Sequence, residues 1–217
     1  MSDIFDEVDE EVRRERLKKL WDRYGYLMVA LAVLFVVGVG AWQGYEKWQA
    51  KKSAEFGAQF TAAAILSEQG KHEEAEKAFA RIAAEGTSGY RVLASLREAA
   101  QLAERDPKAA VAAYDDIAAK NAGSQLLGDF AAVRAAMLLV DTAPFSELAH
   151  RLEPLAQSNA PFRHSARELL AFAAWKAGDM AAVRKWSQLV REDPESPSSL
   201  RERVDILLAL AGENGKG

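Results

Sequence analysis

The chain has 217 residues, of which 49% are hydrophobic and 28% are charged, and its formal net charge is −4. This length suits one globular domain plus a further segment, and the apolar content is sufficient for a core. The acidic balance argues against a nucleic-acid partner, because such proteins usually carry a basic patch or a high isoelectric point. The chain contains no cysteine, which excludes disulfides, thiolate nucleophiles and cysteine-based zinc sites.

Residues 1–23 are predicted to form a short amphipathic helical tail. Its first apolar residues recur at every fourth position, at Ile4, Val8 and Val12. Acidic residues come before basic ones, so that pairs such as Asp9–Arg13 stand four residues apart and favour a helix. Two interpretations remain open: a docking element, or a solvated tail whose basic residues only set membrane topology.

Residues 24–45 form an uncharged, strongly apolar run. As a helix the run would rise about 33 Å, close to the thickness of the hydrocarbon core of a bilayer. Aromatic residues of the type enriched at membrane–water interfaces stand at both ends: Tyr24, Tyr26, Trp42 and Tyr45. The run is therefore predicted to be a single transmembrane helix.

The flanking basic residues predict the direction of this span. Six precede it, namely Arg13, Arg14, Arg16, Lys18, Lys19 and Arg23, and three follow within a similar window, namely Lys47, Lys51 and Lys52. The excess places the N-terminus in the cytoplasm and residues 46–217 outside the inner membrane, in the periplasm of a Gram-negative cell.

A cleaved signal peptide is the competing interpretation of this run. Gly38-Val39-Gly40 loosely resembles the small residues of a cleavage site. However, the preceding region is long and rich in acidic residues, and the apolar run exceeds the usual length of about 7–15 residues. An uncleaved anchor is therefore favoured.

The chain after residue 50 alternates helical stretches with short breaks. The breaks contain glycine, proline or aspartate, at Gly70, 86–89, 106–107, Gly123, 141–144, Pro161, 178–179 and 193–197. No stretch shows the alternation expected of a strand, so no sheet is predicted.

The helical stretches repeat a pattern in which a small or apolar residue is followed by a large one at +4 and an apolar one at +7. The four occurrences are Ala75-Phe79-Ile82, Ala110-Tyr114-Ile117, Leu148-Leu152-Leu155 and Ala182-Trp186-Leu189. Their starts lie 35, 38 and 34 residues apart, close to the 34-residue period of tetratricopeptide repeats.

The preceding helix of each pair offers a small residue for close packing, at Ala63, Ala99, Ala136 and Ala171. The predicted fold is all-α: a transmembrane helix, then a tetratricopeptide-like α-solenoid of about four helical hairpins, capped by a helix over residues 198–210.

The N-terminal region resembles a known family. The tail opens with MSDIFDEVDEEVRRERL and ends with LKKLWDRYG, and the span ends with VGVGAWQGYEKWQ. With a following repeat array, this resembles the YfgM-like ancillary subunits of the SecYEG translocon, in their alphaproteobacterial form. The resemblance implies an inner-membrane protein whose repeats lie in the periplasm. It also implies association with SecYEG and with a membrane-anchored periplasmic chaperone of the peptidyl-prolyl isomerase type, in support of secreted clients.

Residues suited to catalysis are sparse in the sequence. The three histidines, His72, His150 and His164, do not stand at metal-ligand spacing, and no phosphate-binding glycine motif occurs. The adjacent Asp115 and Asp116 would point about 100° apart on a helix, which suits a solvated face. We expect no enzymatic activity, no metal and no cofactor, and we expect Trp175 and Trp186 to belong to the core.

Protein binding is the favoured function class, because solenoids present a concave groove lined by the first helix of each pair. The predicted register places Phe60, Ser67, Phe130 and Met137 in this groove. Two hypotheses share this structural basis: a translocon-associated scaffold that assists secreted clients, and a membrane-anchored scaffold for another envelope assembly such as cell division or outer-membrane biogenesis.

Overall fold

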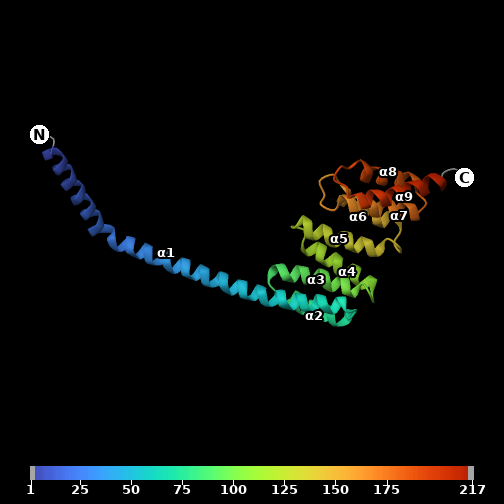
Figure 1. Cartoon of the computed structure of the whole chain (residues 1–217), viewed down its shortest axis with the longest axis horizontal. Coiled ribbons are helices and arrows are strands. Elements are labelled where there is room, and N and C mark those ends of the chain that lie inside the picture. The colour runs from blue at the N-terminus through green and yellow to red at the C-terminus, as the bar shows by residue number, and fades with distance from the viewer. Residues whose placement is uncertain (1–2, 215–217) are drawn as a thin grey trace. The chain divides into compact units, whose positions relative to one another are not determined.

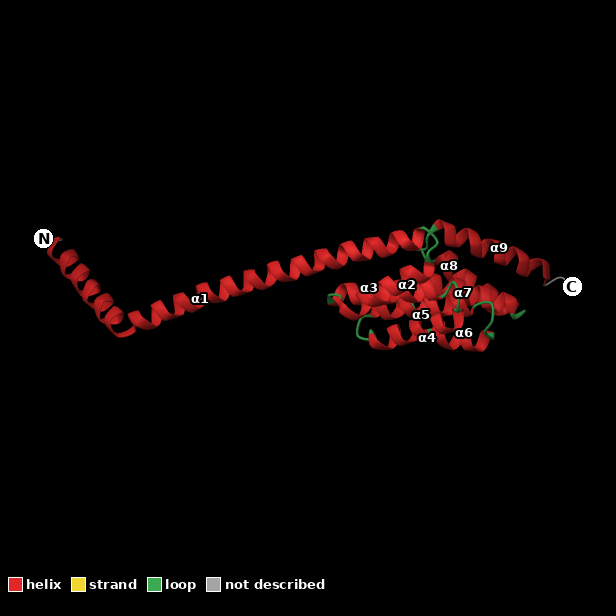
Figure 2. Cartoon of the chain, turned by 90° about the horizontal axis from the view of Figure 1, so that it is seen from below, coloured by secondary structure: helices red, strands yellow, loops and turns green. Residues whose placement is uncertain are grey.

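The computed structural model describes residues 3–214, and these contain helices joined by short loops with no strand (Figure 2). The helices are α1 (Asp3–Glu68), α2 (His72–Glu85), α3 (Ser88–Leu102), α4 (Pro107–Lys120), α5 (Gln125–Leu139), α6 (Phe145–Leu152), the short 3₁₀ helix η1 (Pro154–Ala156), α7 (Arg163–Lys176), α8 (Met180–Glu192) and α9 (Ser198–Asn214). The predicted all-α class is confirmed.

The chain divides into two compact units, residues 1–55 and residues 56–217. The first unit holds most of α1, and this helix is long and apolar enough to cross a membrane. The side chains of the predicted span are exposed, with Leu34 and Phe35 each 72% accessible. An exposed helix that is apolar on all sides is stable only where lipid or another protein surrounds it.

The second unit is a stack of helical hairpins that follow one another in chain order (Figure 1). Residues 56–68 of α1 pack with α2 around Phe79 and Ile82, and α3 joins them through Ala94. Helices α3, α4 and α5 share a second cluster around Tyr114. Helices α5 to α9 and η1 share the largest cluster. Each interface is local in sequence, as expected of a repeat array.

Glycine ends the first helix of the first and last hairpins, and aspartate begins the second helix of the second and last hairpins. Gly70 and Gly178 have φ of +74° and +76°, a conformation that glycine adopts without steric cost. Each ends a first helix by donating its N–H to a carbonyl three residues back, at 3.0 Å in both cases. Asp106 and Asp179 then cap α4 and α8, because each carboxylate accepts the N–H three residues later at 2.9 Å.

The small residues predicted for close packing are buried. Ala63, Ala99, Ala136 and Ala171 are each at most 1% exposed. Opposite them, Phe79, Tyr114 and Leu152 are also at most 1% exposed, in accordance with the predicted role of the large residue at +4. A methyl group lets the helix axes approach, and the large residue of the next helix fills the remaining space.

The pattern predicted for α8 is confirmed at Trp186, which is buried, and at Ala182, which packs against the core, but it is wrong at its last residue. Leu189, expected in the core, is 37% exposed, whereas Val183, Ser187 and Val190 are fully buried. The cause is α9, whose Leu200 and Val204 pack on Val190 and so turn the buried face of α8 toward the end of the stack. The pattern Ala182-Trp186-Leu189 has the spacing of the repeat, but that spacing does not reveal that α9 also packs on α8.

The third repeat also departs from the predicted pattern at its end. Pro154 follows the last turn of α6, and its ring cannot continue the helix because it lacks an N–H. Leu155 therefore lies in η1 and is only partly buried against the core.

The observed burial of α8 predicts effects of different size at two adjacent residues. Val190→Ala should lower the free energy of unfolding by about 2 kcal/mol, since it removes buried methyl groups and leaves a cavity. Leu189→Ala should change it by less than about 1 kcal/mol. Urea unfolding of the full chain, followed by circular dichroism, measures both. A larger effect at Leu189 than at Val190 would restore the register inferred from sequence.

Candidate functional site

Two hollows of the second unit are lined mostly by its first helices, which are residues 56–68 of α1, then α3, α5 and α7. The surface along this face of the first helices is here called the groove. Each of these helices has one buried packing alanine: Ala63, Ala99, Ala136 or Ala171. The residues that line the hollows include those six, three and two positions before this alanine and those one and four positions after it. These offsets place the residues on one helical face, so that equivalent positions of successive hairpins lie along the groove. The groove contains two separate hollows.

The first hollow, here called the N-terminal cavity, has a volume of about 490 Å³. Its lining residues are Phe60, Leu93, Leu96, Arg97, Ala100, Tyr114, Phe130 and Arg134. Tyr114 is fully buried beneath it, and its hydroxyl donates to the carbonyl oxygen of Leu96 at 3.4 Å. Phe60 is held by an edge-on contact with Phe79, with ring centroids 5.2 Å apart. The floor is therefore aromatic and fixed by the core.

The second hollow, here called the C-terminal cavity, has a volume of about 460 Å³ and lies against α9. Its lining residues are Met137, Val140, Asp141, Glu168, Leu169, Phe172, Trp175, Lys176 and Arg203. Its charged residues pair with one another: Arg203 donates to Glu168 at 2.5 and 3.0 Å, and Lys176 pairs with Asp141. The carboxylate of Glu168 raises the pKa of the Arg203 guanidinium. The free surface of this cavity is thus mainly apolar.

Three of the four residues predicted for the groove line these cavities. Phe60 and Phe130 line the N-terminal cavity, and Met137 lines the C-terminal cavity. Ser67, in the last turn of α1, lines neither cavity. A role of these residues in binding stays a prediction.

Sequence reasoning missed several groove residues. Trp175 was expected in the core, but it is 39% exposed and lines the C-terminal cavity, while Trp186 is buried as expected. Trp175 stands four residues after Ala171, as Ser67 does after Ala63. The position four residues after the alanine, at which Ser67 was predicted to line the groove, could therefore have identified Trp175 as a groove residue.

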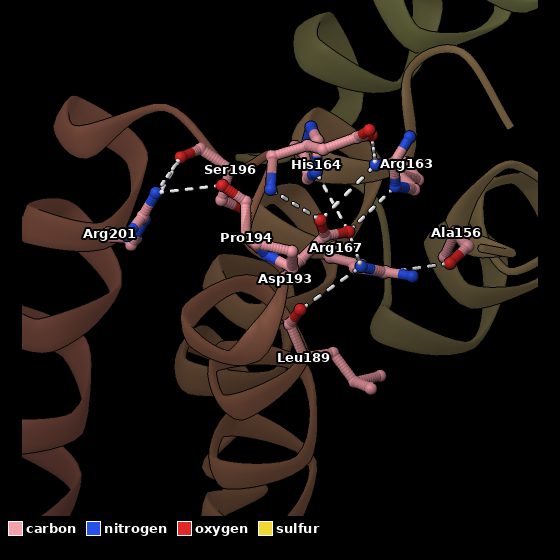
Figure 3. A network of polar contacts seen from close by, with 10 residues as sticks. Ala156, Arg163, His164, Arg167, Leu189, Asp193, Pro194, Ser196 and Arg201 are labelled. Carbon is pink, nitrogen blue, oxygen red and sulfur yellow. Dashed lines mark hydrogen bonds and ion pairs between the residues drawn. The ribbon is translucent and has the colours of Figure 1, made fainter. Parts of the chain in front are cut away.

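A dense group of ionisable side chains lies outside the groove, at the junction of α7 with the α8–α9 loop (Figure 3). Asp193 is its centre. Arg163 Nε and Arg167 Nη1 approach Asp193 Oδ2 at 2.8 and 3.0 Å, and His164 Nε2 lies 3.0 Å from the same oxygen. All four side chains are at most 14% exposed.

This cluster connects η1, α7 and α8. Arg167 also donates to the carbonyl oxygens of Ala156 and Leu189, at 3.0 and 3.2 Å, and so connects η1, α7 and α8. The hydrogen bond from Arg163 holds the pKa of the Asp193 carboxyl well below its usual range. Arg163, which also pairs with Glu195, has its own pKa raised. The polar atoms are directed at each other and at backbone carbonyls, an arrangement suited to stabilising the fold.

Comparison with known families identifies the array. The sequence matches the family described as tetratricopeptide repeat-like domain over residues 18–188, which is most of the chain. The chain belongs to this family. Neither the curated proteins nor the solved structures gave a match.

Tetratricopeptide repeat-like domains are typically scaffolds for protein interaction. The match begins within the N-terminal helix and ends within α8. Helix α9, which covers Val190 and borders the C-terminal cavity through Arg203, lies beyond the matched residues. The tetratricopeptide-like domain of this chain thus includes a terminal helix that shapes part of its groove.

The Asp193 cluster predicts a specific dependence of stability on pH. Because the pKa of Asp193 is lower in the folded than in the unfolded state, its contribution is complete above about pH 4 and is lost as the pH falls further. Asp193→Asn should cost about 3 kcal/mol at pH 7, since it leaves buried cations without their counter-ion. It should also reduce the loss of stability between about pH 4 and pH 2.

Urea unfolding at a series of pH values measures both effects. The control is Asp205→Asn, whose carboxylate pairs with Arg191 in an exposed bridge and should contribute less than about 1 kcal/mol. Equal losses for the two variants at pH 7 would show that the Asp193 cluster does not stabilise the end of the stack.

Proposed function

We propose that the chain is an inner-membrane-anchored scaffold that binds partner proteins in the groove of its tetratricopeptide-like domain. The observation that carries the proposal is the series of exposed apolar side chains along the groove. Leu93, Met137 and Trp175 are 47%, 46% and 39% exposed and line the two cavities. Large apolar residues gathered in a hollow of the surface are characteristic of protein interaction sites.

The proposed organisation has three parts. Residues 1–23 form a cytoplasmic tail, residues 24–45 cross the inner membrane, and residues 46–217 form the periplasmic domain. The all-round apolar surface of the span and the excess of basic residues before it support this arrangement. A groove that binds proteins requires no catalytic group, and we propose a non-enzymatic role.

The proposed partners are the SecYEG translocon and a membrane-anchored periplasmic chaperone of the isomerase type. The support is the resemblance of residues 1–50 to the YfgM-like subunits, together with the tetratricopeptide-like array that follows. In this role the groove would receive unfolded segments of secreted clients near the exit of the translocon. The alternative is a scaffold for another envelope assembly, such as cell division or outer-membrane biogenesis, which would use the same fold.

Topology gives the first test. In sealed inverted inner-membrane vesicles, a tag at the C-terminus should be protected from added protease and a tag at the N-terminus should be removed. Detergent should expose both tags, which controls for protease activity. Digestion of the C-terminal tag in intact vesicles would place the domain in the cytoplasm and rule out a role at the periplasmic exit of the translocon.

Site-specific crosslinking gives the second test, and the absence of native cysteine makes it simple. Met137→Cys places a thiol-linked photocrosslinker in the C-terminal cavity. Leu126→Cys places it on the same helix at a residue 59% exposed that lines neither cavity. Illumination of intact membranes should give adducts with SecYEG subunits or the isomerase-type chaperone from position 137 in clear excess over position 126. Adducts with division proteins and none with the translocon would favour the alternative.

A further inference from the structure

Two arginines stand at equivalent positions of consecutive repeats and face the same hollow. Arg97 of α3 and Arg134 of α5 each precede the buried alanine of their helix by two residues. Both line the N-terminal cavity. Because equivalent positions of neighbouring first helices lie along one face, the two guanidinium groups can contact a single bound segment.

Neither guanidinium is paired with a carboxylate in the part of the chain whose side chains the structure describes. Among the described residues, Arg97 and Arg134 have no carboxylate within 4 Å, whereas Arg105, Arg151 and Arg203 each pair with one. The lining of the N-terminal cavity contains these two cations and no acidic residue. The guanidinium carbon of Arg134 lies 5.9 Å from the ring centroid of Tyr114, so this side chain rests on the fixed aromatic floor.

The two cavities of the groove therefore differ in charge. In the C-terminal cavity, Lys176 pairs with Asp141 and Arg203 with Glu168, which leaves mainly apolar surface free. In the N-terminal cavity the aromatic surface is accompanied by two free cations. The planar guanidinium offers parallel N–H donors that match a carboxylate, and contact with an apolar floor strengthens such a bond by excluding water.

We propose that the N-terminal cavity binds a partner segment in which aspartate or glutamate stands next to large apolar residues. The carboxylates bind Arg97 and Arg134, and the apolar side chains contact Phe60, Leu96 and Phe130. The C-terminal cavity, whose Met137 follows Arg134 by three residues on α5, then receives the purely apolar part of the same segment, which fixes the direction in which the segment lies. This inference rests on the proposed function of the groove and adds the chemistry of its ligand.

Selection from random 12-residue peptides displayed on phage tests the inference on the full chain held in nanodiscs. The wild type should select peptides rich in Asp and Glu beside Leu, Phe or Trp. The double variant Arg97→Gln/Arg134→Gln should lose this acidic enrichment. Arg91→Gln, at an exposed arginine of α3 that does not line the cavity, is the matched control and should retain it.

One selected peptide, synthesised with a fluorescent label, gives the affinity by anisotropy. The double glutamine variant should bind it at least about tenfold more weakly, and Arg91→Gln should bind it as the wild type does. The affinity for the wild type should fall with added salt, because the contacts are charged. Unchanged thermal unfolding of each variant shows that the fold is retained.

The outcomes separate this inference from the proposed function. Peptides selected without acidic enrichment, or bound equally by the double variant, would overturn the inference and leave the scaffold function standing. If the wild type selects no peptide and position 137 gives no protein adduct in membranes, the proposed function fails together with the inference.

Discussion

Each hairpin of the second unit has apolar residues on more than one face, and the close approach of helices at one alanine per repeat determines how these faces are covered. Ala63, Ala99, Ala136 and Ala171 are buried because the neighbouring helix lies against their methyl groups. Phe79 and Tyr114 fill the space between the helices at the present separation. A larger residue in place of the alanine would push the helices apart, and these rings would then no longer fill that space. The stack, its groove and its terminal contacts all depend on this packing.

The last described hairpin, α7 and α8, is followed by the single helix α9 rather than by a hairpin. In this chain α9 covers α8 through Val190 and Val204, and the Asp193 cluster fixes the loop between the two helices to α7. The cluster brings three basic side chains to the carboxylate of Asp193, and Arg163 also pairs with Glu195. The hydrogen bond from Arg163 lowers the pKa of Asp193, which favours the ionised carboxylate that these cations require.

The same helices that form the core also form the groove, since each first helix has its alanine on one face and its groove residues on the next. Residues of the groove are thus held by a rigid scaffold, as in Phe60, whose ring contacts the buried Phe79. A preformed groove binds a segment at a lower entropic cost than a flexible surface would. Its two cavities differ because the second is bordered by α9, which supplies Arg203 to neutralise Glu168.

The sequence by itself determined the apolar span, the helical class, the breaks between helices and the packing alanines. These features follow from local chemistry: an uncharged run, helical periodicity, and the glycine, proline and aspartate that end or begin helices. Tertiary structure alone decided the face of α8 that is buried, the exposure of Trp175 and the gathering of Arg163, His164 and Arg167 around Asp193. Each of these depends on a helix that is distant in sequence or that covers a second face, and spacing along one helix carries no information about such a neighbour.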